Sequence, residues 1–191
     1  MNIFCLDKCP IQSARWVNDR HCVKMPTESI ELLAFCFPAS RLSDLDCPRT
    51  KTGNVRKQPK TYAKHPSTKW VLQSIGNFDW LLAHATEMTE EKLRRYPDKP
   101  MHFARYFLDW CVKNRADSIV PHKPMTDFTI AISDSMGCRN VNGFSELSRV
   151  EQYRLYYAID KVHIAQWRAN KPDWYDTLVE NNQTNYSHSE P

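Results

Sequence analysis

The residues best suited to chemistry in this sequence lie between Asp19 and Glu28. His21, Lys24 and Glu28 are three and four residues apart, so on a helix they share one face. An imidazole, an amine and a carboxylate on one face can serve as a base, a nucleophile and a charge that stabilises a cation. Arg20 lies beside this column. The spacing therefore predicts a catalytic face on which Glu28, His21 and Lys24 carry the reaction.

A charged column of this kind is also typical of an ordinary solvent-facing helix. Apolar residues on both sides favour the catalytic interpretation, because they predict that the column lies at the edge of the core. These apolar residues are Ala14, Val17, Ile30, Leu33 and Ala34.

Positive charge is concentrated in one segment, residues 41–70, which we call the basic block. The chain has a net charge of +4, but the basic block contains eight Lys or Arg and only two Asp, which gives it +6. A local excess of positive charge in a folded protein favours a polyanionic partner, most often nucleic acid. We therefore expect Lys57 and Lys64 to bind the backbone of double-stranded DNA. An ordinary lysine-rich loop is the alternative.

Two further segments carry residues suited to contacting DNA. The segment from His65 to Lys69 joins the basic block to a predicted helix start, where backbone amides, helped by Ser67, Thr68 and Lys69, would hold a phosphate. We expect His65 and Lys69 to contact DNA. Tyr153, Arg154 and Lys161 combine aromatic rings with cations, which together stack on bases and neutralise phosphates. The alternatives are a simple helix cap for the first segment and core packing for the aromatic residues of the second.

Length and composition indicate one folded domain. The chain has 191 residues, 41% hydrophobic and 12% aromatic, enough to bury a core. No apolar run approaches the ~20 residues that span a bilayer. The first residues do not resemble a signal peptide, so we expect a cytoplasmic protein without membrane contact. Seven irregularly spaced cysteines predict free thiols rather than disulfides or a zinc site at Cys5, Cys9 and Cys22. We expect no metal and no cofactor.

The predicted fold is mainly α-helical, a compact single-domain bundle over residues 1–179 with long irregular loops and a polar tail at 180–191. Residues 1–7 form a packed N-terminal arm or short strand. Helices are predicted at 11–24, at 27–35 after a break at Pro26, and at 67–96, 101–114 and 145–168, with a short helix at 127–135. The longest loop, at 39–66, has a length typical of functional loops.

Three motifs together resemble one known family. They are Asp19-Arg20-His21-x-x-Lys24-x-x-x-Glu28, His65-Pro66-x-x-x-Trp70 and Pro172-x-Trp174-Tyr175. In their order and spacing they resemble the pyrimidine-dimer DNA glycosylase superfamily, the endonuclease V-type repair enzymes of phages and bacteria. The opening Met-Asn-Ile-Phe is similar to that of small phage and bacterial relatives of these enzymes.

The resemblance implies a fold and a mechanism. It implies a compact helical domain whose N-terminal residue lies across the active site, with the α-amine of Met1 as nucleophile. It also implies a catalytic glutamate seven residues after a histidine, the separation of His21 and Glu28. The enzymes of this family flip a nucleotide out of strongly kinked DNA. Asn2 and Arg20 are then expected to contact the DNA.

We therefore expect a DNA N-glycosylase, acting as a monomer, that excises a base and leaves an abasic site, with or without lyase activity. Two substrates stay open: a pyrimidine dimer, which implies repair, and a bulky modified pyrimidine such as a sugar-decorated phage base, which implies antiviral defence. The nucleophile is the Met1 amine, Lys24 or water. Alternatives from other classes are a non-catalytic DNA-binding protein and an enzyme that acts on free nucleotides.

Overall fold

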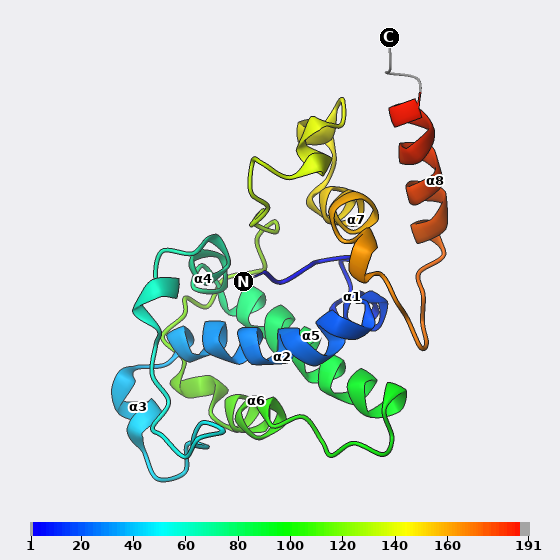
Figure 1. The fold of residues 1–191 in the computed structure, drawn as a ribbon. Helices are drawn as coiled ribbons and strands as arrows, with labels where there is room; N and C mark the ends of the chain where they lie inside the picture. The colour runs from blue at the N-terminus through cyan, green and yellow to red at the C-terminus, as the bar shows by residue number, and fades with distance from the viewer. Residues whose placement is uncertain (1, 188–191) are drawn as a thin grey trace.

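The structure is a computed structural model that describes residues 2–187, with side chains up to Asn182. Over this range it contains eight α-helices and no strand (Figure 1), so the predicted mainly α fold is confirmed. The α-helices are α1 (Pro10–Trp16), α2 (Asp19–Leu33), α3 (Ala39–Ser43), α4 (Pro66–Val71), α5 (Ile75–Arg95), α6 (Ala104–Lys113), α7 (Arg149–Asp160) and α8 (Trp174–Ser187).

The core forms where α2 and α1 pack against the long helix α5. Each of these helices repeats apolar residues every three or four positions, which gives it one buried face. From α2 the buried residues include Met25 and Ile30, and from α5 they include Phe78 and Leu81. α6 adds Phe107 to the same apolar cluster. The predicted helical bundle therefore has one continuous core, in which α1, α2, α4 and α6 all contact α5.

The N-terminal arm is buried in this core as an extended segment. Residues Ile3, Phe4, Cys5 and Leu6 are at most 5% exposed. The arm runs from the N-terminus at the centre of the molecule to α1 (Figure 1). Its backbone is held by side chains: the Leu6 amide donates to Ser13 Oγ at 2.9 Å, and Arg154 Nε donates to the Leu6 carbonyl at 2.8 Å.

The first helical region breaks at a different place from the one predicted. The break falls at Val17–Asn18, and Pro26 lies inside an uninterrupted α2. Asn18 caps α2, because its side chain accepts from the amide of His21 at 2.9 Å. A proline inside a helix costs about 3 kcal/mol. Burial of residues on both sides of Pro26, including Met25 and Ile30, offsets this cost and keeps the helix whole.

Other predicted boundaries differ because local caps end the helices. The predicted helix at 67–96 is divided into α4 and α5, since Ser74 Oγ accepts from the Asn77 amide and starts α5 anew. The predicted helix at 145–168 is α7 alone, which begins at a capping box formed by Ser148 and Glu151. Residues 127–132 are extended rather than helical. The chain expected to fray from residue 180 continues as α8 to Ser187.

We predict that Gly76→Ala destabilises the protein. A Cβ at this position would lie 2.7 Å from Cα of Met125 and would also clash with the Met125 amide, so the backbone would have to move. Overpacking of this kind costs about 1–3 kcal/mol. Helix propensity alone would stabilise the variant by up to ~1 kcal/mol. The sign of the change in the free energy of unfolding, measured by urea denaturation, therefore tests the close approach, and a stabilised variant would contradict it.

Candidate active site

The column of His21, Lys24 and Glu28 borders a pocket of about 280 Å³. Three other segments complete its walls: the N-terminal arm, the loop at 131–136 and the end of α7. Glu28 is the one carboxylate among the described residues that line the pocket. The full lining consists of Asn2, Phe4, His21, Lys24, Met25, Glu28, Ala131, Ser133, Met136, Tyr156 and Lys161.

The Glu28 carboxylate is held between α2 and the N-terminal arm. Oε1 lies 2.9 Å from the Lys24 ammonium, and Oε2 accepts a hydrogen bond of 3.2 Å from the backbone amide of Asn2. The Glu28 side chain is 14% exposed, which leaves the carboxylate open to the pocket but shielded from bulk water. The arm therefore brings the N-terminal end of the chain beside the candidate catalytic carboxylate.

Lys24 has the properties of a charged partner rather than of a nucleophile. Its side chain is 70% exposed. The hydrogen bond to Glu28 is the main reason that the pKa of Lys24 is raised above its ordinary value. An ammonium group has no free electron pair, and an exposed side chain is not desolvated, so this geometry does not favour Lys24 among the possible nucleophiles. Lys24 is placed instead to neutralise and orient Glu28.

His21 is buried under the pocket as a neutral imidazole. Its ring stacks on Phe4, with the ring centroids 4.2 Å apart, and Nδ1 forms a hydrogen bond with the Tyr157 hydroxyl. Burial lowers the pKa of His21 to about 3, with further lowering by Lys161 and Lys24. A neutral ring can accept or donate one proton through hydrogen bonds, but it cannot hold a phosphate by charge.

Phe4 was not identified from the sequence, although it shapes the pocket floor. Its ring lies between His21 and the nearly parallel ring of Tyr156, whose centroid is 6.0 Å away. Phe4 has a φ of 44°, in the left-handed region that a bulky residue rarely adopts. Such a conformation costs about 1–3 kcal/mol. The sequence predicted a packed N-terminal arm over residues 1–7 but gave no signal that Phe4 would border the pocket.

Asn2 supports this strained conformation and does not face DNA as expected. Its Oδ1 accepts from the backbone amides of Ile3 at 2.8 Å and Phe4 at 3.3 Å, and its Nδ2 donates to the Ala131 carbonyl at 3.1 Å. The residue is 6% exposed. The Asn2 side chain is thus fully used to fix the arm. Met1, the expected nucleophile, lies outside the described residues.

Of the three residues expected to contact DNA from the region of α7, only Lys161 borders the pocket. Its ammonium lies 4.6 Å from the centroid of the Tyr156 ring. Tyr153 is completely buried, and its hydroxyl donates to the Thr129 carbonyl and accepts from the Ala131 amide, so it belongs to the core. Arg154 lies over the rings of Trp16 and Trp174 and fixes the arm.

The expected phosphate site at the start of α4 is not formed. His65 closes this end of the helix, because its Nδ1 accepts from the Ser67 amide at 3.1 Å, and Ser67 is completely buried. α4 is only six residues long, which also limits its dipole. Arg20, Lys57, Lys64 and Lys69 are exposed on the surface, as a DNA-contacting role requires.

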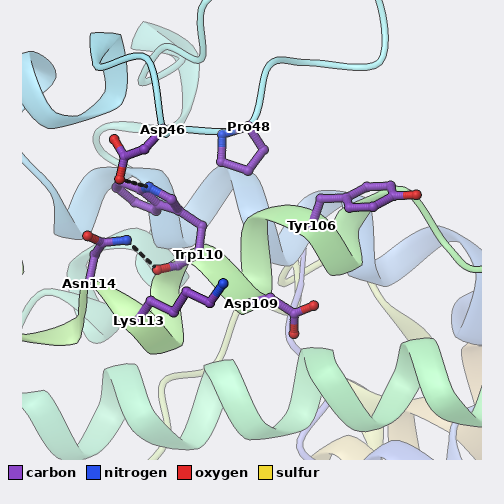
Figure 2. A pocket seen from close by; sticks show the side chains of 7 residues that line it. All are labelled: Asp46, Pro48, Tyr106, Asp109, Trp110, Lys113 and Asn114. Carbon is purple, nitrogen blue, oxygen red and sulfur yellow. Dashed lines mark hydrogen bonds between the residues drawn. The ribbon is translucent and has the colours of Figure 1, made fainter.

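A larger pocket of about 460 Å³ lies between α6 and the loop that follows α3, at Asp46 and Pro48 (Figure 2). Both of its carboxylates are already paired with protein groups. Asp46 accepts from Trp110 Nε1 at 3.1 Å and from Arg41, while Asp109 accepts from Arg105 at 2.7 Å. The Arg41 guanidinium holds the pKa of Asp46 below its usual range. This arrangement ties α3 to α6 and offers less for chemistry than the Glu28 pocket.

Comparison with protein-family models, with curated proteins and with solved structures finds no match to this chain. Among the described residues, no group of three or more His, Cys, Asp or Glu side chains is arranged to hold a metal ion. None of the helices in that range is both long and apolar enough to span a bilayer.

We predict that His21→Gln flattens the pH dependence of stability in acid. The unfolded chain takes up a proton on histidine as the pH falls below about 6.5, whereas folded His21 does so only near pH 3. The free energy of unfolding therefore decreases as the pH falls through this window, and the variant removes part of the decrease. Urea denaturation between pH 3 and 7 measures it.

His84 offers a matched comparison for this measurement. It is buried on α5, away from the pocket, and burial likewise lowers its pKa to about 3. His84→Gln should flatten the same window while leaving the pocket intact. An unchanged pH slope in His21→Gln would mean that the imidazole is already protonated in the folded protein.

Proposed function

We propose that the protein is a DNA N-glycosylase that flips a nucleotide out of the duplex and excises a damaged or bulky modified pyrimidine. The observation that carries the proposal is the hydrogen bond of 3.2 Å between the Asn2 amide and Glu28. It joins the N-terminal arm to a carboxylate seven residues after a buried histidine, the arrangement that the resembled glycosylase family implies. The pocket at this junction, about 280 Å³, is close to the lower end of small-molecule sites (roughly 300 Å³) and accommodates a single extruded base.

Glu28 takes the central role in the proposed mechanism. Cleavage of an N-glycosidic bond leaves positive charge on the sugar, and a carboxylate beside C1′ stabilises this charge as it develops. Glu28 opens to the pocket with little exposure to bulk water, so its charge acts through a poorly screening medium. It also lies where it can orient an attacking group. The attacking group is either an amine of the N-terminal arm or a water molecule.

The surface around the pocket suits a DNA duplex. Lys24 and Lys161 place two ammonium groups at the pocket itself, and Arg20 lies exposed on the same helix. The basic block adds further exposed lysines to the surface of the protein, among them Lys57, Lys64 and Lys69. Such charges attract the DNA backbone and make binding dependent on salt. An enzyme of free nucleotides would need no such surface.

We predict that Glu28→Gln lowers the rate of base excision at saturating DNA by about 10²-fold or more, because the neutral amide cannot stabilise a cationic sugar. The substrates are ultraviolet-irradiated DNA, unmodified DNA and glucosylated phage DNA, and the readout is the number of abasic sites. Duplex affinity should change less than threefold. Asp98→Asn is the control, an identical chemical change at an exposed position outside the pocket, and should retain full activity.

The outcomes distinguish the classes of function. Loss of excision with retained binding supports catalysis by Glu28 and identifies the substrate by the DNA that reacts. A protein that binds duplex DNA but releases no base from any of the three, with Glu28→Gln indistinguishable from wild type, is a non-catalytic DNA-binding protein. Activity on free nucleotides that does not change with salt concentration would support an enzyme that acts on free nucleotides.

Lys24→Met tests the source of the nucleophile. We predict that the variant forms as much borohydride-trapped adduct with DNA as wild type does, because Lys24 is held as an ammonium by Glu28. An adduct that persists identifies an arm amine, which mass spectrometry of the trapped peptide locates. Base release without any adduct in wild type identifies water. An adduct lost only in Lys24→Met would contradict the assigned charge state.

A further inference from the structure

A second pocket beside α2 contains an arginine whose charge is not balanced by a bonded partner. The pocket, of about 630 Å³, lies between Glu31 of α2 and residues 50–59 of the basic block. Arg56 lines it and is 7% exposed. Its guanidinium lies 4.1 Å from the centroid of the Phe107 ring. Among the described residues it has neither a hydrogen bond nor a salt bridge, and its Nε is buried without a partner.

A buried guanidinium without a partner is expensive, because it gives up hydration and receives little in return. The groups around Arg56 offset only part of this cost. Phe107 offers its ring face, and Cys47 and Cys111 are close, but burial raises the pKa of both thiols, so they are neutral. Glu31 lines the same pocket and attracts Arg56 electrostatically, but the two form no salt bridge. The arginine is therefore poised for an anion that the folded chain does not supply.

We propose that this pocket binds a backbone phosphate of the DNA, next to the nucleotide that enters the Glu28 pocket. Arg56 supplies a buried planar donor, and Lys57 adds an exposed ammonium at the rim. Thr50 and Asn54 contribute polar side chains to the same wall. The inference rests on the proposed function only for the position of the phosphate along the strand.

The proposed position assumes that the DNA strand follows α2, because Glu28 lines one pocket and Glu31 lines the other. Glu28 and Glu31 are three residues apart on one helix, which is roughly 4.5 Å along its axis. Successive phosphates of one strand rise about 3.4 Å along a duplex. The phosphate should therefore belong to a nucleotide within about three positions of the target. Gln58 fixes the loop that presents Arg56, since its Nε2 donates to the carbonyls of Phe37 at 2.8 Å and Ala34 at 3.3 Å.

A scan with single methylphosphonates tests the contact. The duplex carries a tetrahydrofuran abasic analogue as the target, and one flanking phosphate at a time is neutralised. Wild type should lose about tenfold in affinity at one phosphate within three nucleotides of the analogue. Arg56→Met should bind the unmodified duplex about tenfold more weakly and lose nothing further at that phosphate. Lys99→Met, an exposed cation outside the basic block, should reproduce the wild-type profile.

A structural role for Arg56 predicts different behaviour. If the cation mainly packs on Phe107, Arg56→Met should lower Tm and keep the methylphosphonate profile of wild type. A phosphate-binding role predicts an unchanged or higher Tm, because the substitution removes an unpaired buried charge. If Arg56→Met does not fold, Arg56→Lys replaces it in the methylphosphonate scan. It should keep a smaller effect at the same phosphate, since an ammonium lacks the planar fork.

Thermal unfolding with inorganic phosphate separates this inference from the proposed function. At matched ionic strength, phosphate should raise the Tm of wild type but not that of Arg56→Met. A positive result in a protein that excises no base would keep the anion site and reject the glycosylase. Excision that depends on Glu28, with identical methylphosphonate profiles and no phosphate effect on Tm, would reject the anion site alone.

Discussion

Residues 2–6 lie buried in an extended conformation between α2, α7 and the loop near residue 131, and the Glu28 pocket exists because they are held there. An extended segment cannot satisfy its own backbone, so other groups must do so. Ser13, Arg154 and the Asn2 side chain bond to the arm at successive positions. Together these bonds fix the position of the Asn2 amide relative to the Glu28 carboxylate. The arm is therefore positioned by the whole bundle rather than by the pocket.

Burial gives the three residues of the column His21, Lys24 and Glu28 different properties. One face of α2 carries all three, but the arm covers only part of it. His21 is buried against Phe4 and is neutral, whereas Lys24 is exposed to solvent and charged. The exposure of the Glu28 side chain is intermediate. A column on a bare helix would have three similar, solvated groups. Because the arm covers part of this face, the three groups differ in exposure and charge. They are a buried neutral imidazole, a partly shielded carboxylate and an exposed cation.

The sequence was sufficient to predict the helical class, the arm and the shared face of His21, Lys24 and Glu28, because these depend on local periodicity. The sequence did not show which polar side chains would be bonded inside the folded protein and therefore could not contact a partner. Tyr153 and Arg154 have the composition of a DNA-binding segment, yet Tyr153 bonds to the Thr129 carbonyl and Arg154 bonds to the arm. Helix boundaries shifted for a similar reason, since caps at Asn18, Ser74 and Ser148 depend on single polar side chains.

Four locally unfavourable features gather around α2. Phe4 has a left-handed backbone, Pro26 lies inside the helix, His21 is a buried imidazole and Arg56 is a buried cation without a bonded partner. A fold selected for stability alone would replace each of them at little cost elsewhere. Their concentration on one side of the molecule fits the general observation that proteins break local rules at sites that bind or react. The same argument distinguishes Arg56 from the exposed lysines of the basic block. An exposed lysine keeps its hydration, whereas the buried guanidinium loses it, and a bound anion would compensate for that loss. Two pockets therefore open along α2, one lined by Glu28 and the other by Glu31 and Arg56, and both proposals depend on this one helix.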